Sequence, residues 1–98
     1  MKIAENILNQ LGGNKFIAMT GSKNFIDGGN YLSMKLVPNK SKSKYLMITL
    51  DSNDTYTMEF FKVNSKTLQK TTISSITGVY NDQLQKIFTE TTGLYTKL

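Results

Sequence analysis

The sequence predicts an α+β fold, in which a four- to five-stranded antiparallel sheet packs one face against an N-terminal and a C-terminal helix. Three consecutive segments, 31–37, 44–50 and 55–63, alternate apolar and polar side chains, as strands with one buried face do. The links between them are short enough for antiparallel hairpins. Apolar residues near both ends of the chain recur at helical spacing instead. At 98 residues, the chain is expected to form a single domain, 1–98.

The first expected element is a short amphipathic helix over residues 2–11. Its apolar residues share one face: Ile3, Ile7, Leu8 and Leu11. The following Gly12-Gly13 pair is a favourable left-handed stop. A helix this short is not stable alone, so its apolar face is expected to pack on the rest of the domain.

The segment that follows the helix predicts a buried strand and two turns. Residues 15–20 form a compact apolar run between glycines, which favours a strand. Residues 21–24 are typical of a turn, and the sequence Asp-Gly-Gly-Asn at 27–30 is a stronger turn signal. Phe25 and Ile26, between the two turns, are compatible with either structure.

The three alternating segments are expected to form the body of the sheet. Their predicted inner face carries nine apolar side chains: Leu32, Met34, Leu36, Leu46, Ile48, Leu50, Tyr56, Met58 and Phe60. Pro38 lies just past a strand end, where its missing N–H costs least. Residues 64–77 are polar and threonine-rich, and they fit either a weak edge strand or a loop.

The last predicted element is a helix over residues 81–92. Its apolar stripe consists of Leu84, Ile87, Phe88 and Thr91. Asn81 is a favourable N-cap, and Gly93 is expected to end the helix with Leu94 packed back against it.

The composition argues against catalysis, because the chain has no histidine, no cysteine and no arginine. Histidine is the usual proton shuttle near neutral pH, and histidine and cysteine are the usual transition-metal ligands. The seven acidic residues are scattered over turns and element ends rather than converging on one cleft. We therefore expect a protein that is not an enzyme and that holds no cofactor and no metal.

The chain is basic, with 12 lysines and a formal net charge of +5. This balance permits binding to a polyanion. Codon usage in an AT-rich genome is the competing explanation, because it favours lysine over arginine. The first residues do not resemble a signal peptide, and no apolar run is long enough for a membrane helix. The expected setting is therefore the cytoplasm of a host cell, with no membrane partner.

One lysine cluster is a candidate binding site. Lys35 falls on the predicted outer face of the sheet, and Lys40, Lys42 and Lys44 surround the neighbouring hairpin. Tyr31, Tyr45 and Phe61 belong to the same outer face. Lysines interleaved with aromatic rings on an open sheet can follow a phosphate backbone and stack bases. The alternative is a solvated face whose lysines protect strand edges from aggregation.

Two stretches of the chain, Leu11–Phe25 and Asp82–Tyr95, together with the lysine loop and strand at Asn39–Leu50, resemble a family of small uncharacterised proteins of bacteriophages and integrated mobile elements. The resemblance covers most of the chain and departs chiefly in residues 64–77. It implies a genomic setting, but no activity and no site residues.

These observations together predict a small non-catalytic binding module. Its expected partner is a nucleic acid backbone, bound without sequence preference, or a phage or host protein that handles nucleic acids. Two alternatives remain open at this point. One is a protein–protein inhibitor of a host defence system, and the other is an oligomeric structural component of a phage.

Overall fold

The computed structural model describes residues 3–96, and within them a five-stranded antiparallel sheet lies beside three helices. The elements follow one another as α1 (Ile3–Leu11), α2 (Asn14–Thr20), β1 (Lys23–Asp27), β2 (Tyr31–Lys35), β3 (Tyr45–Leu50), β4 (Tyr56–Val63), β5 (Lys70–Val79), the 3-10 turn η1 (Asn81–Gln83) and α3 (Leu84–Thr92). The predicted α+β class and antiparallel sheet are confirmed.

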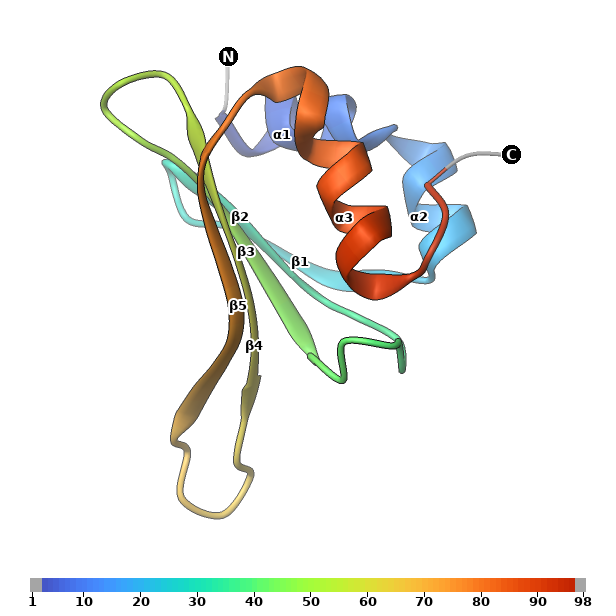
Figure 1. The fold of residues 1–98 in the computed structure, drawn as a ribbon, viewed down its shortest axis with the longest axis vertical. Coiled ribbons are helices and arrows are strands. Elements are labelled where there is room, and N and C mark those ends of the chain that lie inside the picture. Colours follow the sequence, from blue (N-terminus) through green and yellow to red (C-terminus); the bar gives the residue numbers. More distant parts are fainter. Residues whose placement is uncertain (1–2, 97–98) are drawn as a thin grey trace.

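The sheet is a simple meander, in which each strand pairs with its neighbours in the sequence (Figure 1). The β1–β2 and β3–β4 connections therefore lie at one end of the sheet, and the β2–β3 and β4–β5 connections lie at the other. The register pairs Leu32 with Ile48 and Leu46 with Phe60 on the inner face. Tyr45 pairs with Phe61 on the outer face.

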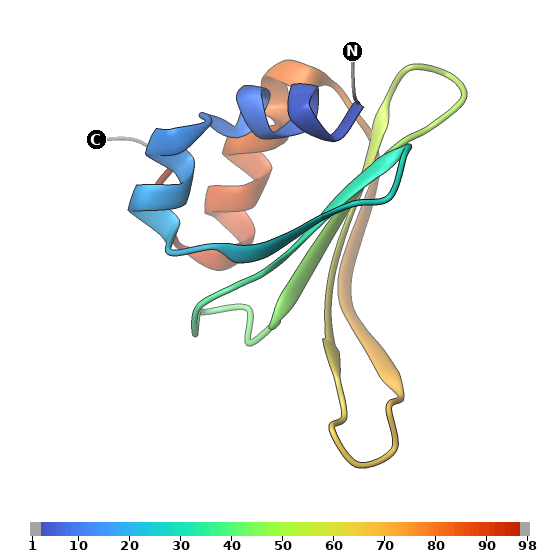
Figure 2. The same ribbon diagram turned by 180° about the vertical axis from the view of Figure 1, so that it is seen from behind.

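The core lies between the inner face of the sheet and the helices, which all lie on that side (Figure 2). Eight of the nine residues predicted for this face are buried, and Leu50 is half-buried. The helices contribute five side chains with no exposed surface: Ile7, Leu11, Phe16, Leu84 and Phe88. The ring centroids of Phe16 and Phe88 are 5.0 Å apart in an edge-to-face arrangement, which joins α2 to α3.

The strand predicted for residues 15–20 is wrong, because this segment forms helix α2. Phe16 and Thr20 are four residues apart and both are buried, as one helical face requires. The Thr20 hydroxyl donates to the Phe16 carbonyl at 2.7 Å, and Gly21 ends the helix in a left-handed conformation. A compact apolar run does not distinguish a buried strand from a buried helical turn, and here tertiary packing decides.

The helix ends agree in part with the sequence prediction. Gly12 and Gly13 both have positive φ, and their N–H groups donate to the carbonyls of Asn9 and Leu8, which ends α1 as expected. Gly93 ends α3 in the same left-handed conformation, and Leu94 packs against the core. The capping role predicted for Asn81 belongs instead to Gln83, whose side chain accepts from the Tyr80 N–H.

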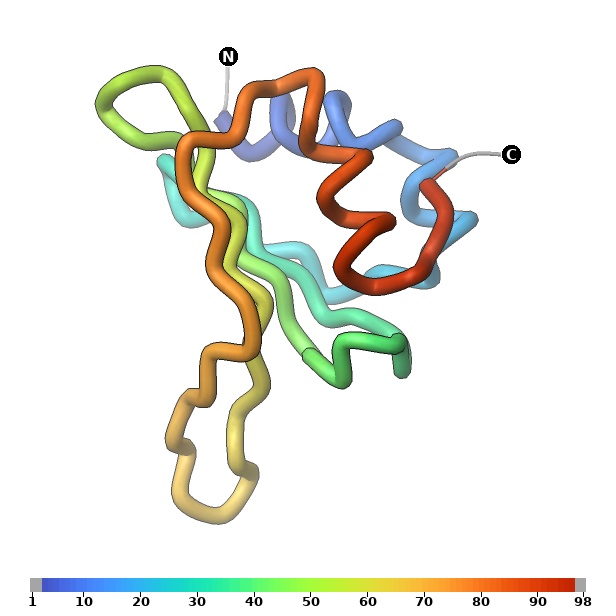
Figure 3. Tube along the Cα trace, in the orientation of Figure 1, coloured from blue at the N-terminus to red at the C-terminus, as the bar shows by residue number. Residues whose placement is uncertain are grey.

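The ambiguous segments become the two edge strands of the sheet. Phe25 and Ile26 lie in β1, and most of residues 64–77 lies in β5. The β4–β5 hairpin reaches beyond both the helices and the other strands (Figures 1 and 3). No helix within residues 3–96 is long and apolar enough to cross a membrane.

We expect Phe16→Ala to lower the free energy of unfolding by about 3–5 kcal/mol, because it removes a fully buried ring and leaves a cavity between α2 and α3. Ile26→Thr is a suitable control, since the Ile26 side chain is 56% exposed on the edge strand β1. It should change stability by no more than about 0.5 kcal/mol. Urea unfolding followed by circular dichroism measures both. Equal stability of the two variants would contradict the packing described for α2.

Candidate polyanion-binding site

The lysines are segregated to one end of the sheet, which we call the basic end. Eight lysines lie in the β2–β3 and β4–β5 connections or in the strand ends beside them: Lys23, Lys35, Lys40, Lys42, Lys44, Lys62, Lys66 and Lys70. Acidic residues occupy the connections at the opposite end: Asp27, Asp51, Asp54 and Asp82. The meander therefore separates charges that alternate along the chain into a basic and an acidic end.

On the outer face, the sheet brings together three of the predicted site residues. The cross-strand register aligns Lys35 with Tyr45, and Tyr45 with Phe61. The two rings are stacked, with centroids 5.6 Å apart and planes 21° from parallel. This row confirms the predicted placement of the three side chains on one face, and Lys23 extends it by pairing with Lys35 on β1.

The Phe61 ring is covered by side chains on both of its neighbouring strands. Tyr45 stacks on it from β3, and the Lys70 ammonium on β5 lies 4.6 Å from its centroid. Such a cation–π contact and an aromatic stack are each worth roughly 0.5–1 kcal/mol at a partly exposed site. The ring that the sequence suggested for base stacking is thus engaged within the protein.

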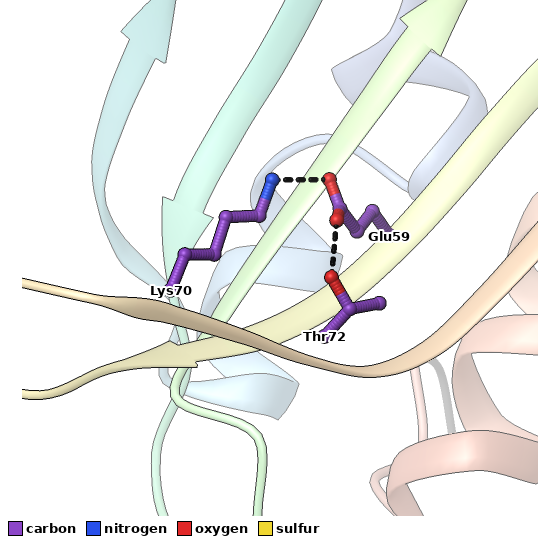
Figure 4. A network of polar contacts seen from close by, with 3 residues as sticks. All are labelled: Glu59, Lys70 and Thr72. Carbon is purple, nitrogen blue, oxygen red and sulfur yellow. Dashed lines mark hydrogen bonds and ion pairs between the residues drawn. The ribbon is translucent and has the colours of Figure 1, made fainter.

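Lys70 also forms the ion pair of the outer face. Its Nζ lies 2.7 Å from Glu59 Oε1, and the Thr72 hydroxyl donates to Glu59 Oε2 at 2.7 Å (Figure 4). The hydrogen bond from Lys70 and the weaker one from Thr72 hold the pKa of Glu59 below its usual value of 4.5, although partial burial opposes the shift. The charge of Lys70 is therefore largely balanced by Glu59.

Two adjoining hollows at the basic end are lined by lysines whose charges are not balanced. Lys44, Lys62 and Lys66 line one hollow of about 530 Å³. Lys35, Lys42 and Lys44 line the other, also about 530 Å³. The ion pairs found within residues 3–96 are Lys70–Glu59 and Lys86–Glu90. These five lysines therefore have no carboxylate within 4 Å among the described side chains.

Lys40, another predicted site residue, lies apart from these hollows. Its backbone N–H donates to the Thr92 carbonyl at 3.1 Å, and its side-chain carbons pack over Gly93. The positive charge is thus near the C-terminal end of α3, where it complements the helix dipole. Its position indicates a structural role in holding the β2–β3 connection against α3.

Tyr31 is on the outer face as predicted, but it lies at the other end of β2. It pairs with Thr49, four residues along the strand from Lys35 and so about 13 Å away. Its ring covers Gly28, where an added Cβ would lie 2.0 Å from two ring carbons. Gly28 therefore allows the ring to close over the β1–β2 turn, which is a structural role.

The cluster predicted from the sequence does not include Lys62, Lys66 and Lys70. Residues 64–77, which contain two of them, fitted either a weak edge strand or a loop. The β-branched residues Thr71, Thr72, Ile73 and Ile76 were the signal for a strand that pairs with β4. The β3–β4 pairing places Lys62 beside Lys44, and the β4–β5 turn brings Lys66 to the same hollow. Within residues 3–96, no three acidic side chains gather in a way that could hold a metal ion.

Glu59→Gln should lower the free energy of unfolding by about 0.5 kcal/mol near neutral pH, because it removes a partly exposed ion pair. Because folding lowers the pKa of Glu59, its ionised carboxylate stabilises the folded protein at pH values above the usual carboxyl pKa. That contribution is lost as the pH falls through the usual value toward the lower folded-state pKa. Urea unfolding across this range should show wild type and variant converging at acid pH. A difference that grows on acidification would contradict the assignment.

Comparison of the chain with models of protein families, with curated proteins and with solved structures gave no match.

Proposed function

We propose that this protein is a non-catalytic module that binds the phosphate backbone of nucleic acids through the basic end of its sheet. The observation that carries the proposal is the group of five unbalanced lysines around two adjoining hollows: Lys35, Lys42, Lys44, Lys62 and Lys66. Lysine is a compact point charge that neutralises phosphate without reading base edges. Binding of this kind suits the phage or mobile-element setting that the resemblance implies.

The state of the aromatic side chains supports a backbone contact rather than base stacking. A protein that binds single strands presents rings with a free face to successive bases. Phe61 has Tyr45 on one side and Lys70 beside its ring, so stacking a base on it would first have to displace a neighbour. The proposal therefore favours double-stranded nucleic acid, whose phosphates are regularly spaced and whose bases are already stacked.

The expected affinity is modest and strongly dependent on salt. Each phosphate that a lysine neutralises contributes about −0.9 to the slope of log K against log salt on duplex DNA. Five lysines predict a slope of about −4 to −5, and a dissociation constant of about 10⁻⁴ to 10⁻⁶ M at physiological salt. Sequence preference should be weak, because no arginine is present to grip guanine.

A pair of charge-matched variants tests this proposal. Lys44→Glu with Lys62→Glu alters the hollow at the basic end, and Lys15→Glu with Lys86→Glu alters exposed positions on α2 and α3. Each pair changes the formal net charge from +5 to +1. We expect the first pair to abolish measurable binding to a 25-base-pair duplex in about 50 mM salt, and the second to retain most of it. Fluorescence anisotropy over a salt series measures both.

An equal loss of duplex binding in the two double variants would show that net charge alone attracts the duplex, and it would overturn the proposed site. Absence of wild-type binding even in about 20 mM salt would overturn the function. Tighter binding to a single strand of the same length would contradict the preference for a duplex.

A second candidate function is protein–protein association through the edge strand β5, either with a second copy or with a host defence protein. This strand is ten residues long and mostly exposed, and such an edge can accept another strand. Residues 72–77 read Thr-Ile-Ser-Ser-Ile-Thr in both directions, which suits antiparallel pairing with a second copy. The β4–β5 register is irregular between Thr72 and Ser74 and again between Ile76 and Val79. Such bulges bend a strand and disrupt its pairing, so only a short stretch of β5 presents a regular edge to another strand, and this weakens the candidate.

Light scattering during size exclusion separates the two candidates. We expect a monomer at about 50 µM, because only a short stretch of the β5 edge is regular. If the wild type is a dimer and Ser74→Pro is a folded monomer, association through β5 is favoured. Because Pro at a paired strand position can disturb the fold, circular dichroism of the variant is the necessary control.

A further inference from the structure

The tip of the β4–β5 hairpin carries a leucine in an unusual position. Leu68 is 76% exposed, the highest value among the large hydrophobic residues of the described chain. Its φ is +60°, a left-handed conformation that L-residues with bulky side chains rarely adopt. The left-handed conformation costs free energy, and glycine or asparagine would avoid this cost. Such a residue in an outlying conformation points to a role outside the folding of the domain.

The tip holds Leu68 in a defined place rather than on a loose loop. The Asn64 N–H donates to the Gln69 carbonyl at 2.9 Å, and the Leu68 N–H donates to the Asn64 carbonyl at 2.7 Å. The Asn64 side chain accepts from the N–H groups of Lys66 and Thr67. These bonds fix the turn between β4 and β5, which lies at the far end of the hairpin (Figure 3). Leu68 belongs to this turn.

The charge around the tip indicates the kind of partner. Lys62 and Lys66 lie on the hairpin with no carboxylate within 4 Å among the described side chains, whereas Lys70 is paired with Glu59. Residues 60–81 contain no acidic side chain. An apolar side chain surrounded by cations fits a partner that is anionic outside and apolar within. A nucleic acid duplex, with phosphates outside and stacked bases inside, has this character, and proteins do insert leucine between its base steps.

We propose that the β4–β5 hairpin is an arm that enters a groove of a DNA duplex and presses Leu68 into a base step. The proposal rests on the proposed function and adds a second element to it: lysines at the basic end hold the backbone, and Leu68 opens the stack. An anionic lipid surface is a weaker fit, because a whole myristoyl chain gives only marginal membrane binding and one leucine is much smaller. The insertion is expected to bend the duplex and to favour steps that are already unstacked.

The central experiment compares an intact 25-base-pair duplex with the same duplex carrying a central nick or mismatch. The wild type should bind the damaged duplex about tenfold more tightly, because part of the unstacking is already done. Leu68→Gly should lose this preference and bind the intact duplex about tenfold more weakly than the wild type, since it loses one buried leucine side chain. Glycine accepts the left-handed conformation, so the variant should keep its melting temperature.

Lys66→Glu is the matched control at the same turn. It should weaken binding to both duplexes by the same factor and keep the preference for the damaged one, because a lysine contacts phosphate whatever the stacking. Energy transfer between dyes at the two ends of the duplex reports the bend, which Leu68→Gly should abolish and Lys66→Glu should preserve once binding is saturated.

The outcomes separate this inference from the proposed function. If the wild type binds a duplex but Leu68→Gly keeps both the preference and the bend, the wedge is overturned and the backbone site stands. If the wild type binds no duplex, both fail. If Leu68→Gly leaves duplex binding unchanged but abolishes binding to vesicles of phosphatidylserine and phosphatidylcholine, Leu68 contacts lipid and the inference is overturned.

Discussion

The fold depends on burying one face of three adjacent strands under helices that are too short to be stable alone. Helix α1 has nine residues and α2 has seven, and isolated helices of this length are marginal in water. They are stable here because Ile7, Leu11 and Phe16 leave water completely when they pack on the sheet and on Phe88. The sheet likewise needs the helices, since its inner face consists of large apolar side chains. Neither layer is an independent unit, because the described helices and strands share one hydrophobic core.

Eight of the 12 lysines lie at the end of the sheet from which the β4–β5 hairpin extends. A meander places every second connection at the same end, so two lysine-rich connections meet although the acidic β3–β4 turn separates them in the sequence. Codon usage in an AT-rich genome would account for lysines in place of arginines. It does not explain why eight of them gather at one end while four acidic residues occupy the other. This segregation is the physical reason to treat the basic end as a surface with a partner.

The sequence predicted the parts of the structure whose signal is local and periodic. Alternation over 31–37, 44–50 and 55–63 identified the inner face, and helical spacing identified α1 and α3. Residues 15–20 form a helix because Phe16 finds a partner in Phe88, 72 positions away, which no local pattern shows. Strand β5 has few apolar residues because one of its edges has no neighbouring strand and the helices leave much of it uncovered. The site was predicted only in part for the same reason: Lys66 joins Lys44 and Lys62 through the β4–β5 hairpin, and sequence periodicity did not reveal its second strand.

The cluster on the outer face explains how an arm with little apolar burial stays ordered. Beyond the helices, the β4–β5 hairpin has lost the core contacts that hold the other strands, and an isolated hairpin is marginally stable at best. The contact of Lys70 with Phe61, and the bonds that Glu59 accepts from Lys70 and Thr72, tie the two strands together where the arm leaves the body. As a consequence, Glu59 balances the charge of Lys70, and the Phe61 ring is covered by Tyr45 and Lys70. Under the proposed function, the arm would be ordered before it meets a partner, so that less conformational freedom would be lost on binding. The contacts that cover Phe61 also stabilise the hairpin that carries Lys62, Lys66 and Leu68.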